Sequence, residues 1–166
     1  MGLMESLARE MTAYYAGDPR RIQHLIKVHS FARWIALEEG LDEPARFVLE
    51  AAALVHDIGI KAAEEKYGSC NGTLQEQEGP ALAEVLLTRL GFARPDVQRV
   101  AYLVGRHHTY KDVDGMDCQI LLEADLLVNI YEDALTPASV QAAVKNVFRT
   151  STGLWICKTM FGLSPP

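Results

Sequence analysis

The stretch AALVHDIGI, at residues 52–60, is the feature that most constrains how this chain folds. Most of its residues are aliphatic, as expected of a buried segment, yet His56 and Asp57 stand side by side near its end. Burying one ionisable group costs free energy, and burying two costs more unless a partner compensates them. The fold must therefore bring another group to this pair inside the core.

The rest of the sequence carries the start and stop signals of helices. Asp18-Pro19, Asp42 and Thr136-Pro137 are typical of helix starts, and Gly40, Gly59 and Gly91 of helix ends. No segment shows the sustained alternation of a strand. We expect an all-α, single-domain bundle of seven to nine helices, located before 17, over 19–39, 43–57 and 61–67, from about 79 to 90, from 94 to about 105, over 118–132, from 137 onward and over 154–161.

Composition limits the classes of partner. The 166 residues suffice for one domain with a core, and the formal charge of −6 argues against broad binding to nucleic acid or anionic membranes, but not against a small phosphorylated substrate. We expect neither a transmembrane helix nor a signal peptide, because no apolar run of the required kind is present. Cys70, Cys118 and Cys157 are far apart and indicate reduced thiols in a cytoplasmic protein. The sequence does not decide whether the protein forms a homodimer.

Two further helices place a polar residue on an apolar face. His24 lies on one stripe with Val28, Phe31 and Ile35, and Asp125 shares a face with the apolar residues of its own helix. Taken singly, an inward histidine is more often a hydrogen-bonded core residue, and an inward aspartate usually pairs with arginine or caps a helix. Together with residues 56–57 they bring metal-binding groups from three helices toward one interior. A divalent cation with bonds of ~2.0–2.2 Å satisfies all of them.

Three stretches resemble the motifs of the HD-domain superfamily of metal-dependent phosphohydrolases: RIQHLIKVHSFA (21–32), LVHDIG (54–59) and EADLLVN (123–129). In the first, a histidine is followed by valine four residues later and by alanine eight residues later. The resemblance covers about residues 20–130. It implies one HD-like domain over residues 1–166, with this core and with helices over 137–162 packed on it. It also implies the metal ligands His24, His56, Asp57 and Asp125.

Two points of the ligand set stay open. His29 lies on a competing stripe of its helix and is the alternative first ligand. Family members with two metals usually have a histidine just before the helix start that here reads GPALA, and this chain has none there, although Glu76 or Glu78 could replace it. We therefore expect one tightly held divalent ion, with a second metal less favoured. The sequence does not choose among Mn²⁺, Fe²⁺, Ni²⁺, Mg²⁺ and Zn²⁺.

The resemblance also suggests catalytic roles. A divalent ion acts as a Lewis acid toward a phosphoryl oxygen and activates water near neutral pH, and Asp57 would orient or deprotonate that water. Lys61, one helical turn later, and Arg106 would supply positive charge to the substrate, and His107 or His108 would protonate the leaving group. The competing interpretation is ordinary surface charge for Lys61 and Arg106, and a loop-exposed pair for the two histidines.

The sequence thus predicts a metal-dependent phosphohydrolase, either a phosphomonoesterase or a phosphodiesterase. Its substrate would be a small phosphorylated compound, with nucleotides among the candidates. The alternative is a non-catalytic, metal-stabilised module that binds a nucleotide or a protein. The complete ligand set and the cation at Lys61 favour the enzyme, whereas the identity of the substrate cannot be read from a fold that serves many activities.

Overall fold

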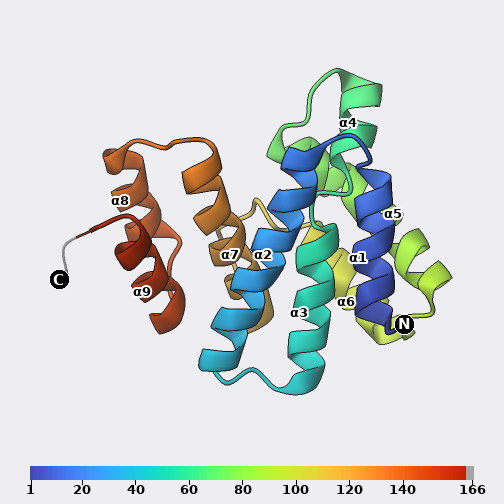
Figure 1. Cartoon of the computed structure of the whole chain (residues 1–166), viewed down its shortest axis with the longest axis horizontal. Helices are drawn as coiled ribbons and strands as arrows, with labels where there is room; N and C mark the ends of the chain where they lie inside the picture. The colour runs from blue at the N-terminus through green and yellow to red at the C-terminus, as the bar shows by residue number, and fades with distance from the viewer. Residues whose placement is uncertain (164–166) are drawn as a thin grey trace.

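Nine α-helices and no strand make up the described residues, 1–163, of the computed structural model (Figure 1). This confirms the all-α prediction; the last three residues of the predicted domain, 164–166, lie outside the described part. None of the described helices is long and apolar enough to cross a bilayer. The helices are α1 (Leu3–Tyr14), α2 (Pro19–Glu38), α3 (Glu43–Val55), α4 (Ile60–Tyr67), α5 (Gly72–Leu90), α6 (Arg94–Val104), α7 (Met116–Glu132), α8 (Pro137–Asn146) and α9 (Ser151–Met160).

Local capping accounts for several helix starts, as the sequence predicts. The side chain of Asp18 accepts a hydrogen bond from the backbone N–H of Arg21 at 3.1 Å, and that of Asp42 accepts one from Ala45 at 2.9 Å. Each acceptor satisfies a backbone donor that the first helical turn leaves unpaired. These caps fix where α2 and α3 begin, and α2 and α3 then lie side by side in the centre of the molecule (Figure 1).

Some predicted helix boundaries are wrong. α5 begins at Gly72, not near Pro80, because the side chain of Asn71 caps it by accepting from the N–H of Leu74 at 3.0 Å. Pro80 lies inside this helix. α3 ends at Val55, so His56 and Asp57 occupy the turn that follows the helix. α7 and α9 begin a few residues earlier than predicted, at 116 and 151.

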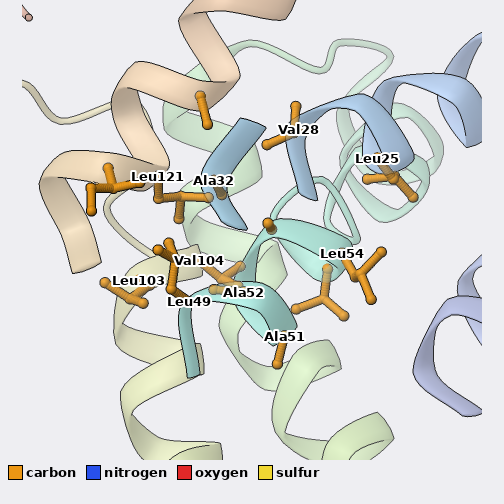
Figure 2. Packing of buried hydrophobic residues seen from close by; sticks show 14 of the residues in the cluster. Leu25, Val28, Ala32, Leu49, Ala51, Ala52, Leu54, Leu103, Val104 and Leu121 are labelled. Atoms are coloured by element: carbon orange, nitrogen blue, oxygen red, sulfur yellow. The ribbon is translucent and has the colours of Figure 1, made fainter. Parts of the chain in front are cut away.

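The core forms around α3, which is apolar on almost every side. Its residues 48–55 are all buried, and it contacts α1, α2, α6 and α7. Figure 2 shows Val28 and Ala32 of α2, Leu49 of α3, Val104 of α6 and Leu121 of α7 gathered in one cluster, and each is fully buried. A helix that is apolar all round is stable only when other helices cover it. The end of α3, which carries the His-Asp pair, is therefore fixed deep inside the protein.

Gly59 has a different role from the predicted helix end. Its φ is −73°, so it does not use the left-handed conformation typical of a terminating glycine, and it precedes α4 as its N-cap. A Cβ at this position would lie 2.7 Å from the carbonyl oxygen of Gln75 and 2.8 Å from the nitrogen of Gly79. Glycine is thus needed here because the turn after the His-Asp pair packs directly on the backbone of α5.

The C-terminal helices lie beside α7, on the side away from α1 (Figure 1). The carboxylate of Glu123 in α7 is fully buried and accepts hydrogen bonds from the N–H groups of Arg149 at 2.6 Å and Thr150 at 2.9 Å. Thr150 in turn caps α9 by accepting from Gly153 at 2.9 Å. This buried carboxylate therefore holds the start of α9 against the helix that carries Asp125.

The Gly59–α5 contact predicts a loss of stability when a side chain is added. Gly59→Ala should lower the free energy of unfolding by roughly 1–3 kcal/mol, because the new Cβ overlaps backbone atoms that cannot rotate away. Urea unfolding followed by circular dichroism measures this difference. Ala81→Ser, at an exposed position of α5, is the control and should stay within about 0.5 kcal/mol of the wild type. An unchanged Gly59→Ala protein would contradict the proposed contact.

Candidate metal centre

Four polar side chains meet where α2, α7 and the turn between α3 and α4 come together. His24 comes from the second turn of α2, His56 and Asp57 from the turn, and Asp125 from the middle of α7. His24, His56 and Asp125 are 6%, 0% and 3% exposed, respectively. Because each side chain comes from an element that is itself packed into the core, their positions relative to one another are fixed by the fold.

The ligand atoms are spaced as a cation would require. His24 Nε2 lies 3.1 Å from Asp125 Oδ1, 3.2 Å from His56 Nε2 and 3.5 Å from Asp57 Oδ2. His56 Nε2 lies 3.5 Å from one oxygen of Asp57 and 3.5 Å from one oxygen of Asp125. Neighbouring ligands on an octahedral ion with bonds of ~2.1 Å are about 3.0 Å apart. His24, His56 and Asp57 offer atoms that all lie within 4.8 Å of one another, and Asp125 lies beside both histidines, so the arrangement is suited to one ion.

The hydrogen bonds of the two imidazoles orient their lone pairs toward this centre. His56 donates from Nδ1 to the carbonyl of Ala53 at 2.9 Å, and His24 Nδ1 lies 3.0 Å from a carboxylate oxygen of Glu132. Both partners are acceptors, so the neutral rings carry their proton on Nδ1 and a lone pair on Nε2. Two nitrogen lone pairs then face carboxylate oxygens, which is repulsive unless a cation lies among them. The donor set fits a divalent metal.

The pKa values of the metal-free protein reflect the same crowding. Burial alone would lower the pKa of His24, but the carboxylates of Asp125 and Asp57 outweigh it and raise the pKa to about 9. The pKa of His56 is also raised, because Asp57 and Asp125 outweigh its burial. Burial would raise the pKa of Asp57, yet His56 and His107 lower it to about 2. Without a metal, protons on the imidazoles thus compensate the carboxylates.

Glu132 supports the first ligand from outside the centre. Its Oε2 accepts from His24 Nδ1, and its Oε1 lies 2.6 Å from Lys27 Nζ. A carboxylate behind a metal-bound histidine fixes the tautomer and the ring orientation and makes the other nitrogen a better ligand. The sequence analysis missed Glu132, although it follows Asp125 by seven residues and so lies on the same face of α7.

The structure separates the two candidates for the first ligand. His29 Nε2 lies 3.2 Å from the buried carboxylate of Glu50, which also accepts from Arg33 at 2.8 Å. This ion-pair network borders a different pocket from the one that contains His24. His24, and not His29, therefore joins His56, Asp57 and Asp125.

A second group of potential ligands adjoins the first. Asp57, His107 and His108 offer atoms that all lie within 4.8 Å of one another, and His107 Nε2 is 3.5 Å from Asp57 Oδ1. His107 is 1% exposed and donates from Nδ1 to the carbonyl of Val104 at 2.7 Å, which leaves its buried Nε2 without a hydrogen-bond partner in the described residues. These atoms could receive a second cation, which the sequence analysis regards as the less favoured case.

The two glutamates suggested as replacement ligands are bound elsewhere. Glu76 accepts from the backbone N–H of His108 at 2.8 Å and from the hydroxyl of Thr109. Glu78 is paired with Lys66 and accepts from the hydroxyl of Tyr67 at 2.9 Å. Neither residue belongs to the metal-binding groups found among residues 1–163. If a second ion binds, its ligands are those of the His107–His108 group.

A pocket of about 560 Å³ opens onto the first centre, which is the group formed by His24, His56, Asp57 and Asp125. Its lining includes His24, Asp57 and Asp125, together with Arg20 and Arg21. The sequence analysis did not single out these arginines, although they precede His24 by four and three residues and so lie one turn away on α2. Cationic side chains and the carboxylates of the centre therefore line the same cavity.

Of the four predicted catalytic and substrate-binding residues, apart from Asp57, only His108 lines this pocket. Burial and the neighbouring His107 lower the pKa of His108 to about 4, so its ring is neutral at pH 7, and its Nε2 lies 3.0 Å from Gln75 Oε1. The ammonium of Lys61 donates a hydrogen bond to the carbonyl of Tyr14, and the guanidinium of Arg106 donates one to the carbonyl of Asp112 at 3.4 Å. The roles assigned to these side chains stay predictions.

The contact of Glu132 with His24 predicts a weaker metal site when the carboxylate is removed. Glu132→Gln should raise the dissociation constant for Mn²⁺ or Co²⁺ by ~10-fold or more, the usual effect of losing such a supporting group. Titration calorimetry on the folded protein measures it. Asp133→Asn is the matched control, because it removes the same charge from the same pocket, but from a residue paired with Arg20 at 2.8 Å. Equal losses in both variants would contradict a specific role of Glu132.

The raised pKa of His24 predicts that metal binding depends on pH. Below about 9, the pKa of the metal-free ring, an incoming ion must displace a proton from Nε2. As the pH rises from about 6 to 8, the dissociation constant for the metal should therefore fall by ~10-fold or more per pH unit, and binding should release protons. Calorimetry in buffers of different ionisation enthalpy measures both effects. An affinity independent of pH, without proton release, would show that the imidazoles are already neutral.

Comparison with known proteins agrees with this geometry. The HD domain family model matches residues 21–138. Among solved structures, the chain is similar to one described as a predicted HD superfamily hydrolase, from an uncultured Thermotogales bacterium. The two are 26% identical with a TM-score of 0.65, and the match covers 96% of this chain and 83% of that one.

Two crystal structures of YpgQ from Bacillus subtilis share the fold. The selenomethionine form is 15% identical with a TM-score of 0.65, covering 98% of this chain and 90% of that one. The other structure is 16% identical with a TM-score of 0.54, covering 98% and 80%. No curated protein matches the sequence. The family match spans most of the chain and contains all four residues of the first centre, so this chain belongs to the HD domain family.

Proposed function

We propose that this protein is a metal-dependent phosphohydrolase that cleaves a small phosphorylated compound. The observation that carries the proposal is the first centre, in which two Nε2 lone pairs and two carboxylates converge beside a pocket that three of the four residues line. A purely structural ion is usually enclosed by protein ligands on all sides. Here His24, Asp57 and Asp125 line a cavity, so a substrate can reach the ion that they would hold.

The protein's own residues would prepare the reaction. A divalent cation held by His24, His56, Asp57 and Asp125 supplies Lewis acidity toward a phosphoryl oxygen and water. Asp57 remains ionised at neutral pH and can accept a hydrogen bond from the attacking water, which orients it toward phosphorus. The donation from Asn129 Nδ2 to Asp125 Oδ1, at 2.9 Å, fixes the other carboxylate. Phosphoryl transfer depends mainly on positioning of this kind.

Arg20 and Arg21 are the cations best placed for the phosphoryl group, because both line the pocket. Arg20 pairs with Asp133 at 2.8 Å, and the two side chains are 67% and 52% exposed. An exposed pair of this kind contributes little free energy, so Arg20 can exchange its carboxylate for a phosphate at small cost. Arg21 is held more firmly, by Glu64 at 2.6 Å. Arg20 is therefore the more mobile contact, and Arg21 the fixed one.

The remaining pocket wall suits a compact organic group. Ile60, Leu126 and Tyr110 give apolar and aromatic surface, while Gln75 and Asn129 give amide groups. A volume of about 560 Å³ lies within the range of cavities that hold small molecules. A nucleotide is one candidate of this size, and a sugar phosphate is another.

A screen for phosphoester hydrolysis tests the proposal, with released phosphate as the readout for monoesters and chromatography of the products for nucleotides and the diester. The wild type is freed of metal, reloaded separately with Mn²⁺, Co²⁺, Ni²⁺, Mg²⁺ and Zn²⁺, and assayed on nucleotides, sugar phosphates and a phosphodiester. Turnover that depends on metal and is lost in Asp57→Ala supports a hydrolase. Metal binding without turnover of any phosphoester would instead favour the non-catalytic binding module.

The arginines give a sharper prediction once a substrate is found. Arg20→Gln should lower kcat/KM by ~10-fold or more, through loss of a charged hydrogen bond to the phosphoryl group, while metal affinity stays unchanged. Arg89→Gln is the matched control, because Arg89 is 63% exposed and pairs with Glu10 at 2.6 Å away from the pocket. If Arg106→Gln lowers kcat/KM and Arg20→Gln does not, the sequence-based assignment is right and the one from the pocket is wrong.

A further inference from the structure

The end of α1 contacts the turn that carries Asp57, although α1 lies outside the residues matched by the HD domain family. Tyr15 is fully buried, and its hydroxyl donates to the backbone carbonyl of Asp57 at 2.6 Å. The hydroxyl of the neighbouring Tyr14 donates to the carbonyl of Ile58 at 3.1 Å. The last residue of α1 and the C-cap residue that follows it thus donate to two consecutive carbonyls of this turn.

Lys61 completes the contact from the other direction. Its ammonium donates to the backbone carbonyl of Tyr14 and lies 4.7 and 5.2 Å from the ring centres of Tyr14 and Tyr15. A cation at the C-terminal end of a helix is favourable, because the last carbonyls carry partial negative charge. The first turn of α4 therefore holds the end of α1, while the end of α1 holds the turn that precedes α4.

These bonds matter because Asp57 is not part of a helix. Residues 56–59 connect α3 to α4, so the ladder of helical hydrogen bonds does not fix the direction in which Asp57 points. Its carbonyl accepts from the N–H of Ile60 at 3.0 Å and from Tyr15. A metal ligand must be held within about 0.5 Å of its productive position. The tyrosine hydroxyl adds a second restraint on the same peptide group.

Tyr15 also connects this turn to the pocket. The guanidinium of Arg21, which lines the pocket, lies 5.6 Å from the centre of the Tyr15 ring. Burial and the nearby Asp57 raise the pKa of Tyr15, so the phenol keeps its proton and remains a donor. One buried ring therefore contacts both a metal-ligand turn and an arginine of the substrate pocket.

We propose that Tyr14 and Tyr15, held in place by Lys61, are positioning residues that set the orientation of Asp57 in the metal centre. The proposal rests on the metal site of the proposed function and extends it to a helix outside the family match. It also gives Lys61 a role that does not require it to reach the substrate. The tyrosines touch neither metal nor substrate, and act only through the peptide groups of the turn.

The test compares tyrosine-to-phenylalanine exchanges in the full chain. Tyr15→Phe keeps the buried ring and removes only the hydroxyl, and Tyr14→Phe removes the adjacent bond. Tyr67→Phe is the control, because its hydroxyl donates to Glu78 at 2.9 Å at the surface, away from the turn. Each protein is shown to be folded by circular dichroism and is titrated with Co²⁺, whose visible absorption reports ligand geometry.

We expect Tyr15→Phe to raise the Co²⁺ dissociation constant by ~10-fold and to shift the visible absorption, while Tyr67→Phe matches the wild type. If Tyr15→Phe does not fold, Tyr14→Phe serves as the test and should show the same changes to a smaller degree. A folded variant with wild-type affinity and spectrum overturns the positioning role while leaving the metal centre intact. A wild type that binds no Co²⁺, Mn²⁺ or Ni²⁺ overturns the metal centre and the positioning role together.

Discussion

The central constraint on this molecule is the convergence of lone pairs in a buried site. His24 and His56 each use Nδ1 as a donor to an acceptor behind the ring, so both Nε2 atoms face Asp57 and Asp125. No arrangement of neutral imidazoles and ionised carboxylates makes this favourable by itself. Positive charge is required, as protons or as a metal ion, and only an ion with several coordination positions interacts with all four groups at once.

The turn between α3 and α4 is held by contacts on two sides. These contacts orient its metal-binding residues although the turn is not helical. On one side Gly59 packs on the backbone of α5, close enough that a methyl group would not fit. On the other side, the hydroxyls of Tyr14 and Tyr15, at the end of α1, donate to the carbonyls of residues 58 and 57. The buried helix α3 delivers the turn to the core, and the contacts on either side orient it. Packing and polar contacts thus have separate tasks in the same four-residue segment.

Local signals in the sequence were enough for the fold class and for most helices. Asp18 caps α2 as predicted, because capping depends on residues a few positions apart. The predicted start of α5 near Pro80 is wrong, because the helix begins after the cap at Asn71 and contains the proline. The role of Gly59 could not be predicted, because it depends on where α5 lies. Helical spacing alone could have predicted that Arg20 lies near His24 and that Glu132 shares a face with Asp125. The contact of Tyr15 with the turn spans 42 residues and carries no local signal.

The composition of the site argues that its residues serve binding and not stability. A bundle of this size would be at least as stable with apolar side chains at positions 24, 56 and 125, because desolvating charged groups often costs more than their pairing returns. Elsewhere the core is mostly apolar, and α3 is apolar almost throughout. Buried carboxylates elsewhere have donors within the protein, since Glu123 accepts from the backbone at the start of α9 and Glu50 accepts from Arg33. Within the described residues the first centre has one neutral side-chain donor, from Asn129 to Asp125, and it opens to a pocket, which is the arrangement expected when the compensating charge arrives with a ligand.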